Sequence, residues 1–291
     1  MLNYIRERGD KILCSIEARG ISIDKTVDLE SIAKDIFKQK KSENPEFMRY
    51  NVTAWNMSFE QCMSDLELFL DEHYFLTENI MIQINFIDKL IFDVNDLLNG
   101  TRNRRKKILA GLDLFPLYEE TIRGYTISEF AKPSSSIFFM RQIIELKLKR
   151  AIGIRQAYNK STKKYEELTM PRLIEFYKKL ERKELLVSPV SLDLLRIMIK
   201  ASNHYIHTGE FNEFFSWHEK IGQMILRELC FKKDERIQSM EGTFIIDKRL
   251  DNTMEKKIKE HFNWGSSVVI EWENAEATII NRINNHQNNI T

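Results

Sequence analysis

Over long stretches of the chain, apolar side chains recur every three or four residues, and this spacing is what most constrains the fold. In residues 78–100 the apolar side chains fall on one face of a helix, and Gly100 follows as its terminator. Residues 58–76 begin with Ser58 three positions before Gln61, which fits a capping box that starts a helix. Further helices are predicted over residues 26–41, 137–152, 170–186 and the segment that precedes Gly209. Ten glycines and five prolines in 291 residues also favour helices over a turn-rich β fold. We therefore predict a mainly α protein, a helical bundle.

The pattern changes in two places, and these suggest domain limits. Around Pro116, Gly124 and residues 131–136 the helical spacing breaks, which places a boundary near residue 130. After residue 235 a short alternating run, a helix and two strand-like stretches at 268–272 and 277–280 follow one another. We predict three segments: an N-terminal helical region (1–130), a helical bundle (131–235) and a small C-terminal α+β appendage of β-α-β-β order with a tail (236–291).

Charge and cysteine usage limit the classes of partner and compartment. Forty-four Lys and Arg balance forty-three Asp and Glu, so the net charge of +1 gives no global attraction for nucleic acid or anionic lipid. A basic cluster at 101–107 is either a phosphate contact or a solvated helix start. Three distant cysteines in apolar stretches are interpreted as buried, reduced thiols. The charged N-terminus is unlike a signal peptide, and no apolar run approaches the roughly 20 residues of a membrane span. We expect a cytoplasmic protein that does not bind membranes.

The helix before Gly209 carries a polar stripe that has the composition of a reactive site. Its members lie at offsets of zero, four, seven and eleven, so they share one narrow face, and His204 lies beside it. They are Arg196, Lys200, Asn203 and His207. The stripe holds no carboxylate that would neutralise its cations, which indicates an anion-facing surface. A neutral imidazole can take up a proton near pH 7, and Asn203 can orient it. The alternative is an ordinary helix end, because histidine near a C-terminus is favoured by the helix dipole.

The helix over 137–152 is apolar around most of its circumference and therefore central. Its polar stripe is Arg141, Glu145 and Lys149, spaced four apart, so that each can pair with the next. Arg141 is either a member of this structural ladder or a cation that faces the same site as His207. The broad apolar surface of the helix predicts a homodimer.

The helix RQIIELKLKRAIGI is followed later in the chain by a helix that ends in Asn-x-x-x-His before a threonine and a glycine. With these features, residues 134–230 resemble the HEPN superfamily of all-α domains. The resemblance implies an Arg-x4-6-His motif, two copies of which meet in a dimer cleft, and a metal-independent ribonuclease of a toxin or phage-defence system. Only Asn203 and His207 match the motif residue by residue. Ser202 stands where the motif has arginine, so Lys200, Arg196 or Arg141 would have to supply the cation, and His204 would help to bind substrate.

Two classes of function follow from these observations. The first is a HEPN-like ribonuclease or RNA-targeting effector, with His207 as general acid or base. The second is a non-catalytic helical protein that keeps the fold and binds a protein partner through its cleft or its C-terminal appendage. The sequence has no glycine-rich phosphate loop, no HExxH and no Cys/His cluster with zinc spacing. We therefore expect neither a cofactor nor a metal site.

Overall fold

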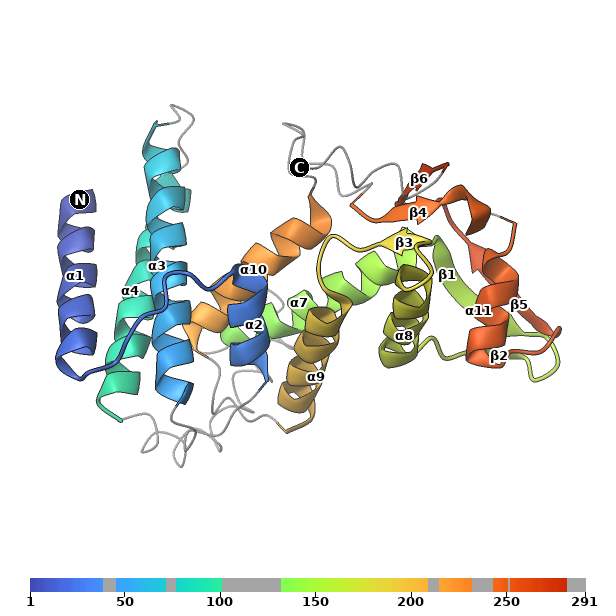
Figure 1. Ribbon diagram of the computed structural model, residues 1–291, viewed down its shortest axis with the longest axis horizontal. Helices are drawn as coiled ribbons and strands as arrows, with labels where there is room; N and C mark the ends of the chain where they lie inside the picture. Colours follow the sequence, from blue (N-terminus) through green and yellow to red (C-terminus); the bar gives the residue numbers. More distant parts are fainter. Residues whose placement is uncertain are drawn as a thin grey trace. The chain divides into compact units, whose positions relative to one another are not determined.

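The chain is mainly α, with small β-sheets that include its C-terminal region, as predicted (Figure 1). A computed structural model describes residues 1–38, 46–71, 77–100, 132–208, 215–231, 243–250 and 252–281, without the side chains of 71, 77–79, 132–136 and 204–208. The helices are α1 (Leu2–Ala18), α2 (Leu29–Phe37), α3 (Glu46–Asp71), α4 (Thr77–Leu98), α7 (Lys132–Ala151), α8 (Met170–Glu181), α9 (Leu192–Thr208), α10 (Ser216–Cys230) and α11 (Met254–Phe262), with a short 3-10 helix, η1 (Lys248–Leu250). The strands are β1 (Ile154–Asn159), β2 (Lys164–Glu166), β3 (Leu186–Val187), β4 (Ile245–Asp247), β5 (Val268–Trp272) and β6 (Thr278–Ile280).

The chain divides into two compact units, each made of two separate stretches of sequence. The first unit comprises Met1–Phe139 and Lys200–Gln223, and the second comprises Met140–Ile199 and Met224–Thr291. The division falls inside α7, α9 and α10. The three contiguous segments expected from the sequence stay a prediction, and their first boundary and the basic cluster at 101–107 lie outside the described residues.

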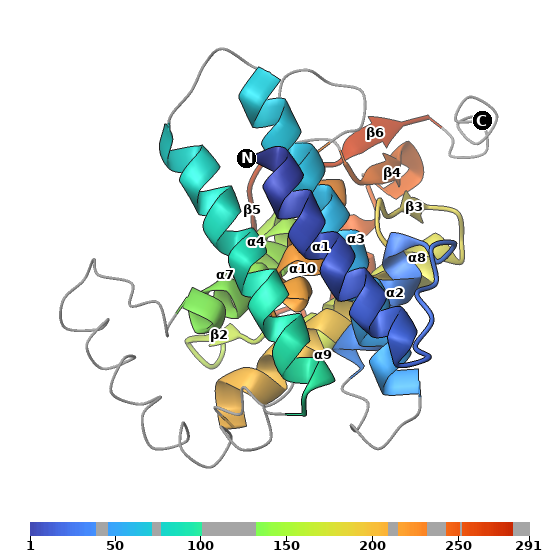
Figure 2. The ribbon, with the colours of Figure 1, turned by 90° about the vertical axis from the view of Figure 1, so that its left-hand side faces the viewer.

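In the first unit, α1, α3 and α4 run side by side, and α2 packs on α3 (Figures 1 and 2). Two buried polar contacts join α10 to α3. The indole Nε1 of Trp217 donates to Asn51 Oδ1 at 2.9 Å, and the buried ammonium of Lys220 lies 2.7 Å from Asp65 Oδ2. Because each of these polar atoms has a partner, their burial does not leave a desolvated group unpaired.

The structure corrects where one helix begins and confirms where another ends. Ser58 does not cap a helix, because α3 already begins at Glu46 and Ser58 is fully buried in its interior. Its apolar face runs through this position, since Trp55 and Phe59 on either side are buried too. The end of α4 was predicted correctly: the helix stops at Leu98, and Gly100 adopts a positive φ of 64°.

The second unit contains two three-stranded sheets. In the order β2-β1-β5, both pairs are antiparallel; in the order β3-β4-β6, β4 pairs antiparallel with β3 and parallel with β6. The expected β-α-β-β order of the C-terminal region is confirmed as β4, α11, β5 and β6. The sequence analysis missed β1, β2 and β3, with which β4 and β5 pair. The C-terminal strands are therefore shared with residues 154–187 and do not form separate sheets.

Residues 273–277 close the C-terminal end of α7. The backbone N–H groups of Glu276 and Ala277 donate to the carbonyls of Arg150 and Ala151, the last residues of α7, at 2.9 and 3.3 Å. The buried ammonium of Lys147 pairs with Glu276 at 3.2 Å. Carbonyls that would otherwise end the helix without partners are thereby satisfied.

The interpretation of all three cysteines as buried was wrong in one case. Cys62 and Cys230 are buried, but Cys14 is exposed. On α1 the buried positions include Ile12 and Ile16, and Cys14 lies midway between them, about 200° around the helix from each. An apolar neighbourhood in sequence therefore did not place this side chain on the packed face.

Candidate functional site

The helix that carries the polar stripe forms as predicted. Helix α9 runs without a break from Leu192 to Thr208, so it includes all four stripe positions, which span about 16 Å along its axis. Its packed face is apolar and holds Leu194, Leu195, Met198, Ile199 and Ala201, all nearly inaccessible to solvent. Arg196 and Lys200 are exposed and Asn203 is half-buried, as expected for a stripe that faces away from that core.

Arg196 does not face solvent as an uncompensated cation, and that part of the sequence analysis was wrong. Its guanidinium lies 3.4 Å from Glu175 on α8 and 3.9 Å from Asp193 on its own helix. Asp193 is itself shared with Lys178, at 2.7 Å. Since these side chains are about half exposed, such pairs contribute little and can be exchanged for another anion at small cost.

Lys200 and Asn203 differ from Arg196, because each has a polar group that can still accept a further polar partner. No carboxylate in the described part of the chain forms an ion pair with Lys200. The side-chain oxygen of Asn203 is buried, and it accepts no hydrogen bond within the same residues. A buried amide oxygen without a donor loses its hydration without replacement, typically at a cost of about 1–3 kcal/mol. A hydrogen-bond donor placed close to the Asn203 oxygen would therefore be stabilising.

The two histidines of the site are placed by their backbone alone. Both His204 and His207 belong to the last turns of α9, but their side chains lie outside the described part of the structure. His207 follows Asn203 by four residues, and residues four apart on a helix are neighbours on its surface. The helix therefore brings the two motif residues together at the level of the backbone.

Arg141 forms the structural pair that its spacing indicated. Its Nε donates to Glu145 Oε1 at 2.8 Å, and both side chains are about three-quarters buried. Arg141 and Arg196 belong to the second compact unit, whereas Lys200, Asn203 and His207 belong to the first. The predicted grouping of all these residues around one cleft therefore stays a prediction, and the chemistry below rests on the last three.

The position that holds arginine in the HEPN motif is a packed position in this chain. Ser202 is only 2% exposed. An arginine there would bring a guanidinium into a site that now holds a small hydroxyl side chain. The exposed cation nearest in sequence is Lys200, which precedes His207 by seven residues and lies two turns away on the same helix.

A further histidine, which the sequence analysis did not single out, has a perturbed pKa. The Nε2 of His261 lies 2.8 Å from the carbonyl oxygen of Arg172, and its Nδ1 lies 3.1 Å from the ammonium of Lys179. These contacts fit a neutral ring that donates from Nε2 and accepts at Nδ1. Burial lowers the pKa of His261, and the neighbouring charges of Lys179 and Arg172 lower it further. Because both ring nitrogens are engaged, His261 acts as a link between α8 and α11.

Within the described ranges, no three or more His, Cys, Asp or Glu side chains are grouped so that they could hold a metal ion. None of the helices in those ranges is both long and apolar enough to cross a bilayer. Comparisons with protein-family models, with curated proteins and with solved structures found no match for this chain.

Proposed function

We propose that this protein is a HEPN-like, metal-independent endoribonuclease, an RNA-targeting effector of the toxin or phage-defence type. The observation that carries the proposal is the buried side-chain oxygen of Asn203, which no described residue pairs with, one turn before His207 and one turn after Lys200. The three residues supply an acceptor that can orient an imidazole, the imidazole itself, and a cation that no described carboxylate pairs with. Together they match the needs of phosphodiester cleavage by the neighbouring hydroxyl of RNA.

Each residue has a distinct part in the proposed reaction. The neutral ring of His207 accepts the proton of a ribose 2′-hydroxyl, whose oxygen then attacks the adjacent phosphorus. The Asn203 oxygen accepts a hydrogen bond from the other ring nitrogen, which fixes the tautomer and the ring orientation. The ammonium of Lys200 stabilises the negative charge that develops on the phosphoryl oxygens. The P–O5′ bond breaks, leaving a 2′,3′-cyclic phosphate and a 5′-hydroxyl.

The leaving 5′-oxygen needs a proton, and a second copy of the chain can supply it from its own His207 in the protonated form. This requirement agrees with the paired clefts that the HEPN resemblance implies. Phe138 and Phe139 on α7 are 45% and 56% exposed, and these side chains give a homodimer an apolar surface to bury. Light scattering at micromolar concentration should give twice the chain mass.

The competing function is a non-catalytic helical protein that binds a protein partner. Two observations favour it: the motif position at Ser202 is buried, and Arg196 and Arg141 are already paired with carboxylates. If this is the function, the stripe is a helix end and no RNA is cleaved.

Cleavage of a short, end-labelled single-stranded RNA in the presence of EDTA separates the two functions. We expect cleavage by the wild type, a loss of about 100- to 10,000-fold in His207→Ala, and a loss of about 100-fold in Lys200→Ala that Lys200→Arg partly restores. Lys183→Ala, which removes another exposed lysine, is the matched control and should cleave normally. A 2′-deoxy sugar at the scissile position should block the reaction. Equal rates for wild type and His207→Ala, or no cleavage by either, would refute the proposal.

A further inference from the structure

The sheet β2-β1-β5 has one buried face and one open face. Ala157 of β1 is buried, as is its partner Ile270 on β5. Tyr158, the next residue of β1, points to the other face and stands opposite Tyr165 of β2 on one side and Val269 of β5 on the other. Tyr165 is 64% exposed and Val269 is 37% exposed. Thus a row of two aromatic rings and a valine crosses the solvent side of the sheet.

The two tyrosine rings are held by their strands. Their centroids lie 5.3 Å apart, with 64° between the ring planes, which is an edge-to-face pair. Strand pairing fixes the backbone on both sides of Tyr158, so the ring needs little ordering when a flat ligand stacks on it. Aromatic residues on an open sheet face are the arrangement on which RNA-recognition modules stack unpaired bases.

Lysines gather at the end of this row. Lys160 and Lys163 are exposed in the turn that joins β1 to β2, and no described carboxylate forms an ion pair with either of them. The turn is ordered by Asn159, whose Oδ1 accepts hydrogen bonds from the backbone N–H groups of Ser161 and Thr162 at 3.0 and 3.3 Å. Two ammonium groups are therefore available beside the aromatic row.

Glu166 and Glu271 are the carboxylates of β2 and β5, and Glu166 lies on the face opposite to Tyr158, because it is paired with Ala157. Glu166 accepts a hydrogen bond from the side-chain amide of Asn159 at 2.7 Å, and Glu271 accepts one from Gln156. Residues 160–163 of the turn contain two lysines and no carboxylate, so local charge at the turn favours an anion, although the net charge of the whole chain is only +1.

We propose that this face, made of Tyr158, Tyr165 and the turn lysines Lys160 and Lys163, binds single-stranded RNA. Unpaired bases stack on the tyrosines, and the phosphates on either side lie against the lysines. A duplex does not fit, because its bases are stacked on one another and present no free ring face. The choice of RNA over DNA rests on the proposed function, while the binding itself does not depend on catalysis at His207.

Binding is measured by fluorescence anisotropy with a labelled 12-nucleotide RNA, in EDTA and with His207→Ala as the parent protein so that cleavage does not interfere. We expect Tyr165→Leu to weaken binding about tenfold, while Tyr165→Phe, which keeps the ring, binds like the parent. Replacing Lys160 and Lys163 by glutamine should lower the slope of log affinity against log salt by about 1.4, since each phosphate contact on a single strand contributes roughly 0.7.

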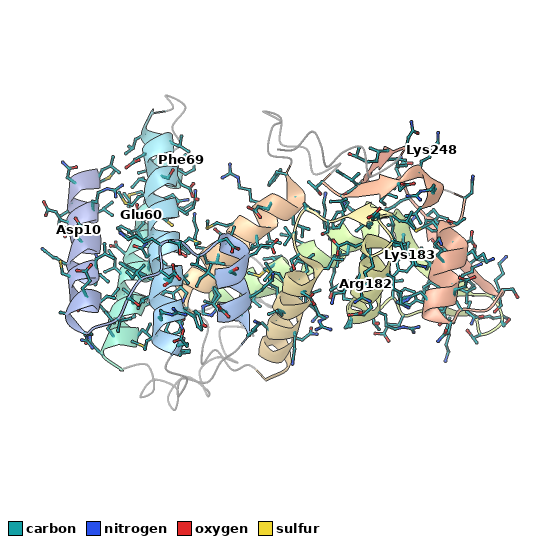
Figure 3. All side chains as sticks on the ribbon, in the orientation of Figure 1. Asp10, Glu60, Phe69, Arg182, Lys183 and Lys248 are labelled. Carbon is teal, nitrogen blue, oxygen red and sulfur yellow. The ribbon has the colours of Figure 1, made fainter. Side chains whose placement is uncertain are left out.

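The charge-matched control replaces Lys183 and Lys248, which lie at the end of α8 and beside β4, apart from β2 (Figures 1 and 3). In this variant, Tyr165→Leu should weaken RNA binding as much as it does in the parent. Unchanged affinity in Tyr165→Leu, equal affinity for a duplex, or no RNA binding at physiological salt would each overturn the proposal; so would a protein ligand held by this face in place of RNA. Because the parent lacks His207, binding can be tested apart from cleavage. RNA binding by the parent without cleavage by the wild type would refute only the proposed ribonuclease activity. Cleavage by the wild type, together with unchanged RNA affinity in Tyr165→Leu, would refute only the proposed binding face.

Discussion

Replacing Gly153 by alanine tests the contact that joins the residue before β1 to the residue after β5 in the second unit. Gly153 lies between α7 and β1 and adopts a positive φ of 73°, which L-residues other than glycine rarely adopt. Its carbonyl accepts a hydrogen bond from the backbone N–H of Glu273 at 2.8 Å. A Cβ atom at this position would stand 2.5 Å from the carbonyl oxygen of Glu273 and 3.2 Å from the backbone nitrogen of Ala275. The new methyl group therefore meets backbone atoms, which cannot rotate away as a side chain can.

Two contributions set the size of the effect. Holding an alanine at positive φ costs about 1–2 kcal/mol, from which about 0.5–1 kcal/mol is recovered because alanine is less free than glycine in the unfolded chain. The steric overlap adds about 1–3 kcal/mol, the usual cost of forcing one more methyl group into a packed site. We expect Gly153→Ala to lower the free energy of unfolding of the second unit by about 1–4.5 kcal/mol.

Gly20→Ala is the matched control. Gly20 has a φ of 71°, but nothing lies within 4 Å of its Cβ position, so only the conformational cost applies, about 1 kcal/mol or less. Hydrogen exchange followed by mass spectrometry gives the opening free energy of each region separately, which a chain of two units requires. The amides of β1 and β5 report on Gly153→Ala, and those of α1 report on Gly20→Ala. If Gly153→Ala costs no more than Gly20→Ala, the close contact with residues 273–275 does not exist in solution.

Two further predictions concern titratable groups. Burial raises the pKa of Cys62 to about 11 and also raises the pKa of Cys230. In the native protein at pH 8, only Cys14 should therefore react rapidly with a thiol reagent, whereas all three cysteines should react after denaturation. Rapid reaction that persists in Cys14→Ser would contradict the buried positions of Cys62 and Cys230. Burial lowers the pKa of His261 in the folded chain. The contacts of its neutral ring therefore stabilise the fold above about pH 6.5, the pKa of histidine in the unfolded chain, and this stabilisation is lost as the pH falls through the lower pKa of the folded chain. The melting temperature should therefore fall less between pH 7 and 5.5 in His261→Gln than in the wild type, and an equal fall in both would count against this role.

The helices were predictable because their signal is local. Apolar spacing located α4, α8 and α9, with ends that agree to within a few residues except at the end of α8, which stops at Glu181 rather than residue 186. The capping-box interpretation at Ser58 failed because a serine can also be buried inside a helix, and only the packing of α3 shows this. Local patterns therefore predict helices more reliably than they predict helix starts.

The strands were missed because they are short or irregular, and because some of their partner strands lie far away in the sequence. β3 has two residues and β2 has three, which is too short for a period of two to be recognised. In β1 the alternation is interrupted at Arg155, where the register with β5 shifts. One of the two partners of β1 is β5, more than 100 residues later, so this pairing could not be derived from the segment itself.

The candidate site shows the same limit. The spacing of Lys200, Asn203 and His207 along one helix is a property of the backbone, and it was predictable. The charge balance of the stripe was not, because the carboxylate nearest to Arg196 is Glu175, which comes from another helix. A stripe without acidic residues in its own helix can still be neutralised by its neighbours.

The open aromatic face depends on the backbone contact between Gly153 and Glu273. Tyr158 is held in its row by pairing with β5, and Gly153 lies just before β1 while its hydrogen-bond partner Glu273 comes directly after β5. Weakening this contact should separate the two strands at that end and disorder the face, although no tyrosine or lysine has been changed. Gly153→Ala is therefore expected to weaken RNA binding by the proposed face in proportion to its loss of protection at β1 and β5. If affinity were retained while β1 and β5 exchange freely, the RNA would have to bind elsewhere on the chain.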